Sequence, residues 1–558
     1  MKGKANRVRS SAPEPAPYVW LLAFVWIEIV AGLSIFPSIS DDVYFYLQLG
    51  RMKWETGRFP ATDPFLFSLS SYAWHLEHEW LSYIVFYAVF RVAGFAGLVL
   101  FKTTLILIPV LLLFLLCRQQ GAQKLCAISA ILLLALFAGA DRLLERASLF
   151  SDALLLVVLL LLYFNSRRPS ATLLIIPALF LLWVNLHPGF ILGLAVLWIF
   201  IADAAIIHRT NPQDTTRRLL LRWIAVGALS IAACFANPLG AKGFFYPLRL
   251  TLAPEWNLFR QFNTEWKPTW RFFPSYETLW FSPLTLLGAA VAFWPRSRAG
   301  WRDRLLLLLF AGLGWSGIRF VLPSAMALVV VLSQVLSRSE PWRWKKGAYL
   351  AIGTCAALTI IVAKLLVFGY RPSTGPRMFG LGENRIINPH CLADFIDRHQ
   401  LQSLRIFNEH DLGAFFIYRF NGAMKVYFHG FVTDMDFYRD NFLGPIQSRK
   451  ELDRIISQFR LQGFILKRPF DRQLLNWVQL QLELSREWDL VYWDDYFVLY
   501  VKKTALEPPL KNWAYRYAPL RMDRADRPSL IAELKRARNE CPSHREAKLI
   551  LQALGVPD

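Results

Sequence analysis

Long runs of apolar residues recur along the first two thirds of the chain and stop near residue 368. A run of about 20 apolar residues is long enough to cross a bilayer as a helix. We therefore expect a multi-pass α-helical membrane domain over residues 18–368, followed by a soluble portion. The pattern predicts eleven spans, at 18–36, 96–117, 124–139, 150–165, 171–187, 189–206, 220–236, 279–294, 305–317, 320–336 and 347–368.

The charges between these runs predict the orientation of the chain. Basic loops are retained in the cytoplasm, and five basic segments share a side with the N-terminus: CRQQGAQK, NSRRPS, HRTNPQDTTRRLLLR, PRSRAGWRDR and SRSEPWRWKK. All five segments lie on this side only if residues 79–94 do not cross the membrane. We interpret these residues as an amphipathic helix on the outer surface. Residues 1–17 are then cytoplasmic, and the first loop (37–95) and the soluble portion lie outside.

The soluble portion changes character twice. Residues 370–504 alternate strand-like and helix-like stretches, which predicts a small α/β domain, and WDLVYWDDYFVLYVKK predicts a hairpin around Asp494 and Asp495. Residues 505–558 have helical apolar spacing, typical of a helix pair or one tetratricopeptide-like unit. One such unit cannot bury its own face, so we expect this tail to dock on the α/β domain. Its role is either packing or the binding of an acceptor or partner.

Composition narrows the class of protein. The 558 residues are 55% hydrophobic, too apolar for an ordinary soluble enzyme, and the net charge is +21. The positive charge is explained by basic loops on the cytoplasmic side. An additional role would be to attract anionic lipid or a lipid-linked phosphate. The sequence has no repeat of basic and aromatic residues that would indicate nucleic-acid binding. The six cysteines lack paired zinc spacing, and Cys391 and Cys541 can pair only in an oxidising compartment.

The polar residues that are hardest to explain gather on the predicted outer side. Asp41 and Asp42 open the first loop, directly before a row of aromatic residues. Asp41 could cap the helix that follows. Asp42 could be a general base whose pKa is raised by its neighbour and by partial burial.

Histidines mark two further positions on that side. His75, Glu77, His78 and Glu79 lack the helical H-E-x-x-H spacing, so no metal is assigned, although a divalent cation stays open. We interpret His78 and Glu79 as binding an acceptor or orienting the first loop. WVNLHPGF places Asn185 and His187 at the end of a span, where a structural histidine is the alternative.

Cations accompany these residues, at Arg142, Arg146, Arg249, Arg260, Lys267, Arg271 and Arg319. Arginine forks suit phosphate geometry, so these side chains would bind a lipid-linked phosphate or bulk phospholipid. A carboxylate base beside cations for a leaving phosphate fits the transfer of a sugar from a polyprenyl-phosphate donor to an acceptor hydroxyl.

Several motifs carry a resemblance to a known superfamily. The first loop, DDVYFYLQLGRMKWETGRFPATDPFLFS with YAWHLEHEWLSY, is followed in order by WVNLHPGF (183–190), NPLG (237–240), NTEW (263–266) and SGIRF. Over roughly residues 15–500 the chain resembles bacterial multi-pass proteins of the GT-C glycosyltransferase superfamily. It is similar at greater distance to protein O-mannosyltransferases and aminoarabinose transferases, which share the acidic first loop.

The resemblance implies roles for particular residues. Asp42 matches the loop carboxylate of the superfamily, which makes it the catalytic candidate. Many members carry a histidine four residues later, where this chain has Tyr46, so no metal or proton-relay role is assigned there. Related chains often have D-G-R where this one has HGF (429–431), and no function is transferred to that loop. The expected substrate-binding residues are Asp41, His78, Glu79, Arg146, Asn185, His187, Glu265 and Arg319.

The resulting hypothesis is a GT-C-type glycosyltransferase of the bacterial inner membrane. It would move a sugar at the outer face from a polyprenyl-phosphate donor to a glycan, lipid or protein acceptor. One alternative is a transporter or flippase, which would need polar residues along a path through the bilayer, whereas the spans offer little beyond Glu28, Asp203 and Lys364. The other alternative is a non-catalytic assembly protein.

Overall fold

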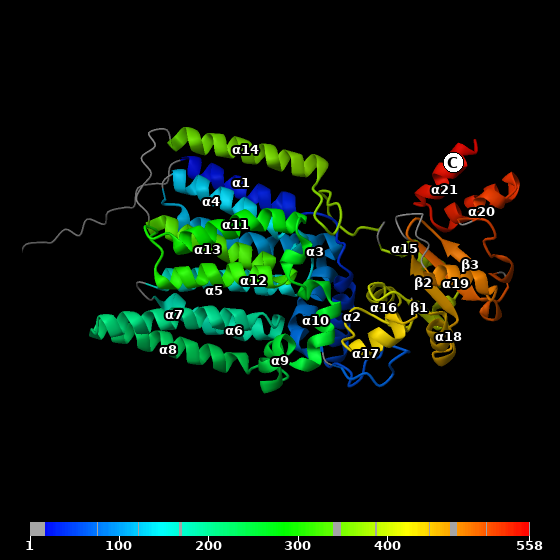
Figure 1. Cartoon of the computed structure of the whole chain (residues 1–558), viewed down its shortest axis with the longest axis horizontal. Coiled ribbons are helices and arrows are strands. Elements are labelled where there is room, and N and C mark those ends of the chain that lie inside the picture. Colours follow the sequence, from blue (N-terminus) through cyan, green and yellow to red (C-terminus); the bar gives the residue numbers. More distant parts are fainter. Residues whose placement is uncertain are drawn as a thin grey trace, which may run out of the picture.

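The computed structural model describes residues 17–74, 76–120, 122–166, 170–338, 347–385, 388–445, 447–468, 477–508, 510–519 and 521–556. Within these residues the chain forms a long bundle of helices, joined at one end to a smaller part that contains a four-stranded sheet (Figure 1).

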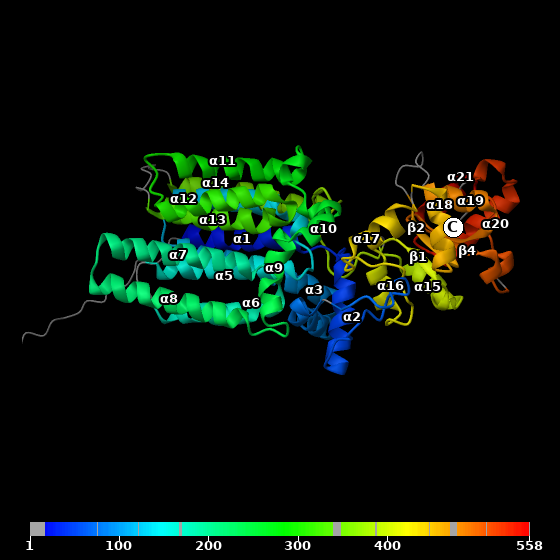
Figure 2. The ribbon, with the colours of Figure 1, turned by 60° about the horizontal axis from the view of Figure 1, so that its bottom comes forward.

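Every predicted apolar span corresponds to a helix of the bundle, and these helices run side by side along the long axis of the molecule (Figures 1 and 2). They are α1 (Pro17–Ser34), α3 (Trp80–Cys117), α4 (Ala122–Ala138), α5 (Ser148–Asn165), α6 (Ile175–Leu186), α7 (Phe190–Thr210), α8 (Asp214–Cys234), α11 (Tyr276–Phe293), α12 (Trp301–Ser316), α13 (Val321–Arg338) and α14 (Gly347–Phe368).

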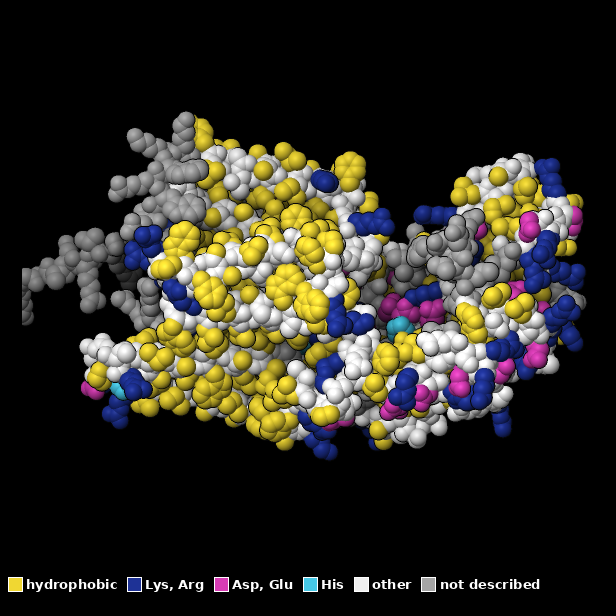
Figure 3. All heavy atoms as spheres, viewed as in Figure 1, with side chains coloured by type: hydrophobic (Ala, Val, Ile, Leu, Met, Phe, Trp, Pro, Cys, Tyr) yellow, Lys and Arg dark blue, Asp and Glu magenta, His cyan; other side chains and the backbone are white. Residues whose placement is uncertain are grey.

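By length and composition, five helical segments in the described part of the chain can cross a membrane: Trp80–Cys117, Ser148–Asn165, Phe190–Thr210, Ile318–Arg338 and Tyr349–Phe368. The flank of the bundle is apolar, as Figure 3 shows, with Leu286, Phe293 and Ile360 each about 70% exposed. Such a surface suits lipid and not water. The total of eleven crossings stays a prediction.

Helix α3 is two helices joined at Gly94. The backbone there has φ of 60° and ψ of −156°, a conformation that residues with a side chain rarely adopt. Residues 80–93 are therefore distinct from the apolar segment that follows, as the sequence predicts. They pack against α2 (Asp41–Thr56). The approach is close because Gly50 of α2 has no side chain, since a Cβ there would lie 2.2 Å from the Tyr83 carbonyl oxygen.

The sheet has the order β1-β2-β4-β3. Its strands are β1 (Ile406–Asn408), β2 (Gly463–Lys467), β3 (Trp488–Trp493) and β4 (Phe497–Lys502), with β1 parallel to β2 and the other pairs antiparallel. The hairpin turns at Asp494 and Asp495, as predicted, because Asp494 Oδ1 accepts hydrogen bonds from Tyr496 and Phe497 N–H groups, both at 2.8 Å. The helices here are α15 (His390–Arg398), α16 (Gly413–Arg419), α17 (Met435–Tyr438), α18 (Arg449–Gln458) and α19 (Trp477–Ser485).

Helix α2 shares a hydrophobic core with the sheet-containing part. Tyr44 packs edge-on against Phe415 with ring centroids 5.1 Å apart, and Phe45 stacks on Phe431 at 4.6 Å. In the same loop, Asp63 pairs with buried His429 at 2.9 Å. The aromatic row after the two aspartates therefore ties the first loop to the C-terminal part.

Two helices complete the chain, α20 (Arg527–Glu540) and α21 (Arg545–Ala553), and they lie against the sheet-containing part. The Asp495 carboxylate accepts backbone hydrogen bonds from Arg545 (2.7 Å) and Glu546 (2.8 Å) at the start of α21. A disulfide joins Cys391 of α15 to Cys541 at the end of α20.

Candidate active site

Three cavities follow one another from the bundle towards the sheet-containing part. The inner cavity, about 110 Å³, is lined by Ser151, Asp152, Leu155, Trp183 and Phe320, among others. The middle cavity, about 180 Å³, is lined by Tyr46, His78, Glu79 and Tyr246. The junction cavity, about 530 Å³, is lined by Asp41, Phe262, His410, Asp411 and Tyr438.

The cavities share charged walls. Arg142, His187 and Arg319 line both the inner and the middle cavity. Asp42, Arg146 and Glu265 line both the middle and the junction cavity. Residues far apart in the sequence therefore converge on one continuous set of hollows, where the membrane-embedded helices end.

An ion-pair network holds the second shared wall together. Arg146 Nε lies 2.8 Å from Asp42 Oδ2, and its Nη1 also donates to Glu265. Arg142 Nη1 donates to the same Glu265 oxygen at 2.6 Å. Burial alone would raise the pKa of Glu265, but the guanidinium groups of Arg142, Arg146 and Arg319 hold it well below its usual value.

Buried contacts of Glu145 hold the segment 142–146, which carries Arg142 and Arg146. Lys102 Nζ of α3 lies 2.8 Å from Glu145 Oε1, and both side chains are fully buried. Ser38 Oγ donates to the other Glu145 oxygen at 3.1 Å. Together these two contacts hold Glu145 in the interior, close in the chain to Arg142 and Arg146.

Asp41 faces the junction cavity. In the described part of the chain its carboxylate has neither a hydrogen bond nor an ion pair, and burial together with nearby Asp411 raises its pKa to about 7. The N-cap of α2 is Ser40, and no side chain makes a capping hydrogen bond there. Asp41 and Asp42 lie in the first turn of the helix, where the helix dipole still favours their negative charge.

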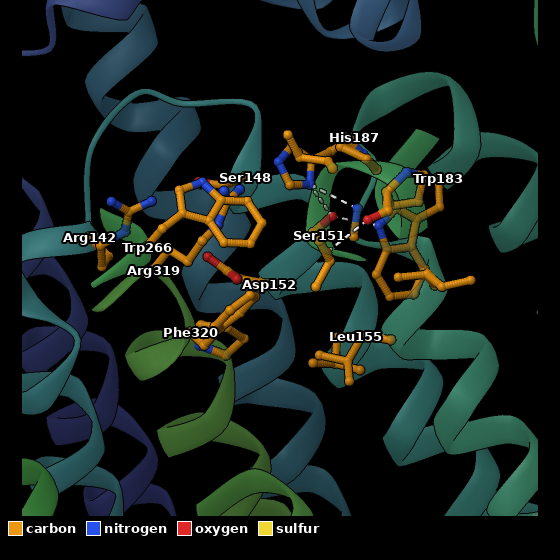
Figure 4. A pocket seen from close by; sticks show the side chains of 18 residues that line it. Arg142, Ser148, Ser151, Asp152, Leu155, Trp183, His187, Trp266, Arg319 and Phe320 are labelled. Atoms are coloured by element: carbon orange, nitrogen blue, oxygen red, sulfur yellow. Dashed lines mark hydrogen bonds between the residues drawn. The ribbon is translucent and has the colours of Figure 1, made fainter. Parts of the chain in front are cut away.

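Glu79 and His187 meet in the middle cavity, 3.6 Å apart. His187 Nδ1 accepts a hydrogen bond from the Gly189 N–H at 3.1 Å and lies 2.6 Å from Ser151 Oγ. The indole N–H of Trp183 donates to the same hydroxyl at 2.6 Å (Figure 4). Because Nδ1 accepts, neutral His187 carries its proton on Nε2, which faces Glu79. Burial, with a contribution from Asp42, raises the pKa of Glu79 to about 8.

Among the described residues Arg319 has no carboxylate within ion-pairing distance, and Glu265 and Glu79 act on its charge only from farther away. The charged carbon of Arg319 lies 4.3 Å from the ring centre of Trp266, and within the described ranges it makes no hydrogen bond or ion pair. Figure 4 shows Arg319 and Trp266 on the side of the inner cavity opposite His187 and Trp183. An unpaired cation on an apolar wall is expensive, so this position is suited to an anionic ligand.

The remaining sequence candidates divide into two groups. His78 lines the middle cavity, with its ring 4.2 Å from that of Tyr246. Asn185 lines none of the three cavities, because its side chain accepts from the Trp80 indole (2.7 Å) and donates to the Ala236 carbonyl (3.0 Å). It acts as a brace between helices. His75 lies outside the described residues.

Four of the predicted cations also lie away from the cavities, namely Arg249, Arg260, Lys267 and Arg271. Arg249 forms a surface pair with Glu255 at 3.0 Å, and Arg260 binds the Leu250 carbonyl at 2.8 Å. Among the described residues, no three acidic, histidine or cysteine side chains come together as metal ligands.

Sequence reasoning missed Asp152 and Lys102. Both lie inside predicted apolar spans, and an ionisable residue within such a run is the signal that would have found them. It also missed His410 and Asp411, which line the junction cavity. No local motif singles these two out, because only the approach of the sheet-containing part to α2 brings them to the site.

Comparison with known proteins bears on the fold. No family model matches the chain, and no curated protein sequence matches it. The archaeal oligosaccharyltransferase AglB from Archaeoglobus fulgidus, in complex with an inhibitory peptide and a dolichol-phosphate, matches with a TM-score of 0.50 and 11% identity, over 80% of this chain and 69% of that chain. The A. fulgidus oligosaccharyltransferase tethered to an acceptor peptide matches with a TM-score of 0.50 and 13% identity, over 87% and 74%.

The aminoarabinose transferase ArnT from Cupriavidus metallidurans, bound to undecaprenyl phosphate, matches with a TM-score of 0.48 and 13% identity, over 86% of this chain and 97% of that chain. At such identities a likeness concerns the fold alone, and the two archaeal structures carry it. The chain therefore shares the fold of the A. fulgidus oligosaccharyltransferase, a multi-pass membrane enzyme fold of the kind that the resemblance of its motifs implies.

Proposed function

We propose that the chain is a membrane glycosyltransferase that moves a sugar from a polyprenyl-phosphate donor to an acceptor hydroxyl. The observation that carries this proposal is the position of Asp42. Its carboxylate stands in the wall between the middle and junction cavities, paired with Arg146. A base in that wall can reach an acceptor on one side and a donor on the other.

The donor fits the inner and middle cavities. The inner cavity has an apolar lining that includes Leu155, Trp183 and Phe320, suited to the first isoprene units. Arg142 and Arg319 stand where it opens into the middle cavity, suited to the phosphate. AglB, which shares the fold, was solved with a dolichol-phosphate, and this supports a lipid phosphate here.

The reaction needs one proton transfer and one bond exchange. Asp42 takes the proton of the acceptor hydroxyl while that oxygen attacks the anomeric carbon of the donor sugar. The bond from the anomeric carbon to the phosphate oxygen breaks, and the polyprenyl phosphate leaves with both electrons. Arg142 and Arg319 stabilise the charge that develops on it. The donor phosphate competes for Arg146 and so frees Asp42 to act as the base.

The outer face of the bacterial inner membrane is the proposed location. Five basic loops indicate a cytoplasmic N-terminus. The disulfide between Cys391 and Cys541 in the C-terminal part supports an oxidising compartment for that part.

Reconstitution tests the proposal. Purified protein in liposomes is supplied with radiolabelled polyprenyl-phosphate sugars and cell-envelope acceptors. Asp42→Asn should lower the transfer rate by about 10²–10⁴-fold, the usual range for losing a general base. Asp436→Asn, which changes an exposed aspartate, is the matched control. Equal transfer by Asp42→Asn and wild type would reject the catalytic assignment and favour a non-catalytic assembly role.

A second variant tests the donor side. Arg319→Gln should raise KM for the polyprenyl-phosphate sugar by about tenfold or more, since a hydrogen bond to a charged group contributes about 1.5–3 kcal/mol. The control is Arg249→Gln, which removes an exposed arginine from the same side of the bundle. Unchanged donor KM in Arg319→Gln, measured from initial rates, would contradict the placement of the phosphate.

A further inference from the structure

The junction cavity is larger than the two donor cavities and has a different lining. One wall comes from α10 (Asn257–Phe262) and the segment that follows it, Asn263 to Glu265, and the opposite wall comes from the sheet-containing part. Figure 3 shows acidic side chains and a histidine gathered in the hollow between the bundle and that part. The cavity therefore exists only because the soluble part docks against the end of the bundle.

The polar lining of this cavity has unmet hydrogen-bonding capacity. In the described part of the chain, Asp41 has no hydrogen-bond or ion-pair partner, and Asp411 Oδ1 is buried without a hydrogen-bond partner. The other Asp411 oxygen is held by Lys467. The ring of His410 lies roughly perpendicular to the rings of Tyr438 and Phe442. A ligand that donates hydrogen bonds suits this lining, because an ionised carboxylate accepts and cannot donate.

The rest of the lining is aromatic. Phe262 of α10 and Tyr438 of α17 approach each other across the two walls, with ring centroids 5.8 Å apart, and both rings are half-buried. Tyr438 is itself fixed by stacking on Phe442 at 5.1 Å. Partly exposed, rigid rings beside a few convergent polar groups are typical of small-molecule sites.

The chemistry of this lining distinguishes three kinds of ligand. Asp411, and Asp41 when it is ionised, disfavour a phosphorylated acceptor through charge repulsion. A peptide that binds by adding a strand would need a free strand edge, but residues 427–428 lie along β1. The Asn408 side chain accepts from the Tyr427 N–H at 2.9 Å and donates to the Phe428 carbonyl at 2.8 Å. A neutral sugar suits the lining best, because its hydroxyl groups donate to carboxylates while its C–H faces lie on aromatic rings.

We propose that the junction cavity is the acceptor site and that the acceptor is a neutral carbohydrate. Asp411 and Asp41 bind its hydroxyl groups, and Phe262 and Tyr438 hold its ring faces. The inference rests on the proposed function, because Asp42 in the shared wall is the base towards which this sugar would present its reacting hydroxyl.

Binding to the full-length protein in nanodiscs tests this inference without any donor. The probes are neutral oligosaccharides of two to six glucose, galactose, mannose or arabinose residues, a Ser/Thr-rich peptide, and a phosphorylated glycolipid, each followed by tryptophan fluorescence and calorimetry. At least one neutral oligosaccharide should bind. Asp411→Asn and Tyr438→Ala should each raise its Kd by about tenfold or more. Tyr438→Leu, which keeps an apolar side chain, guards against misfolding.

Lys467→Met is the matched control for Asp411, because it removes the ion pair and leaves the cavity lining unchanged. Its Kd should stay within about twofold of wild type if Asp411 acts through its own oxygens. Three results would overturn the inference. The first is no oligosaccharide binding at millimolar concentrations, and the second is a Kd that neither Asp411→Asn nor Tyr438→Ala changes. The third is tight binding of the peptide or the phosphorylated glycolipid in place of the oligosaccharide.

The transfer assay separates this failure from failure of the proposed function. If oligosaccharides bind as expected but no polyprenyl-phosphate sugar supports transfer, the enzymatic proposal fails and the carbohydrate site stands. If transfer occurs to a protein or lipid acceptor while oligosaccharides do not bind, the enzyme stands and the carbohydrate acceptor is rejected.

Discussion

Adjacent aspartates at the start of α2 have separate surroundings. Asp42 is neutralised by Arg146, whereas Asp41 is desolvated beside Asp411, and its pKa is raised to about 7. Neighbouring side chains of one helical turn point in different directions. This divergence lets one carboxylate meet the donor side while the other faces the junction cavity.

At the residue scale, the raised pKa of Glu79 predicts a pH dependence of stability. The folded protein holds this proton up to a pH of about 8, against an ordinary value of 4.5. The contribution of Glu79 to the stability of the fold is therefore greatest at pH values below about 4.5, where this carboxyl is protonated in both the folded and the unfolded state. It falls as the pH rises from 4.5 to 8, because the unfolded state loses the proton first. Glu79→Gln removes this penalty, so its stability should exceed that of wild type by on the order of 5 kcal/mol at pH 9.

Thermal unfolding in detergent between pH 5 and pH 9 measures this effect. The melting temperature of wild type should fall more steeply with pH than that of Glu79→Gln, and the two should converge towards pH 5. Glu255→Gln, at an exposed position, serves as the control. Parallel curves for wild type and Glu79→Gln would show that Glu79 is ionised at neutral pH.

Most of the candidate residues that a motif pointed to line the cavities. Asp42, Glu79, His187, Glu265 and Arg319 all line the cavities, and each lies in a stretch that resembles GT-C proteins. Asn185 lies in the same kind of motif and is a brace instead. A motif identifies a conserved type of position, but only packing decides whether the side chain faces a cavity or a neighbouring helix.

At the element scale, the loop between α4 and α5 depends on one buried ion pair. Removing either partner leaves an uncompensated buried charge, which destabilises by about 3–5 kcal/mol, whereas replacing both is far milder. Glu145→Gln should therefore lower the melting temperature and misplace Arg142 and Arg146. Lys102→Met with Glu145→Gln together should regain most of the stability.

A double-mutant cycle on melting temperature and on transfer rate checks this expectation. Additive effects of the two substitutions would mean that Lys102 and Glu145 do not interact. A double variant that regains stability without regaining transfer would show that the pair positions the arginines as well as stabilising the loop.

The apolar runs predicted the helices because burial in lipid or protein demands long apolar stretches. The strand-like segment 424–431 was less predictable. It lies outside the four-stranded sheet, and its Val426 forms an isolated bridge to Leu66 of the first loop. Its alternating apolar residues pack between α2 and the sheet, an environment that imposes the same pattern as a strand of the sheet does.

At the scale of the whole molecule, the chain should have one orientation. In a cysteine-free background, Gln447→Cys in the C-terminal part should react with an impermeant maleimide in intact cells whose outer membrane is permeabilised. Gln213→Cys, before α8, should react only after the inner membrane is opened. Both positions are exposed, so reactivity reports the compartment. The reverse pattern would overturn the outer-face location.

The convergence of the site could not be derived from the sequence. Asp41, Glu265 and Asp411 come from α2, the loop after α10 and the loop after β1, and nothing in their local patterns records that they share a cavity. Their meeting follows from a hydrophobic core that includes both the first loop and the sheet-containing part. Packing between segments that are distant in the sequence leaves no local signal, because each segment shows only the usual alternation of apolar and polar residues.

The bridge between Asp42 and Arg146 has a consequence for an idle enzyme surrounded by water. A free carboxylate beside an activated glycosyl phosphate would also deprotonate water, and the sugar would be lost by hydrolysis. With one oxygen in an ion pair with Arg146, the resting carboxylate is a weaker activator of solvent than a free one. Hydrolysis of the donor in the absence of an acceptor should accordingly be slow compared with transfer to an acceptor. The ion pair would thus protect the donor sugar from hydrolysis.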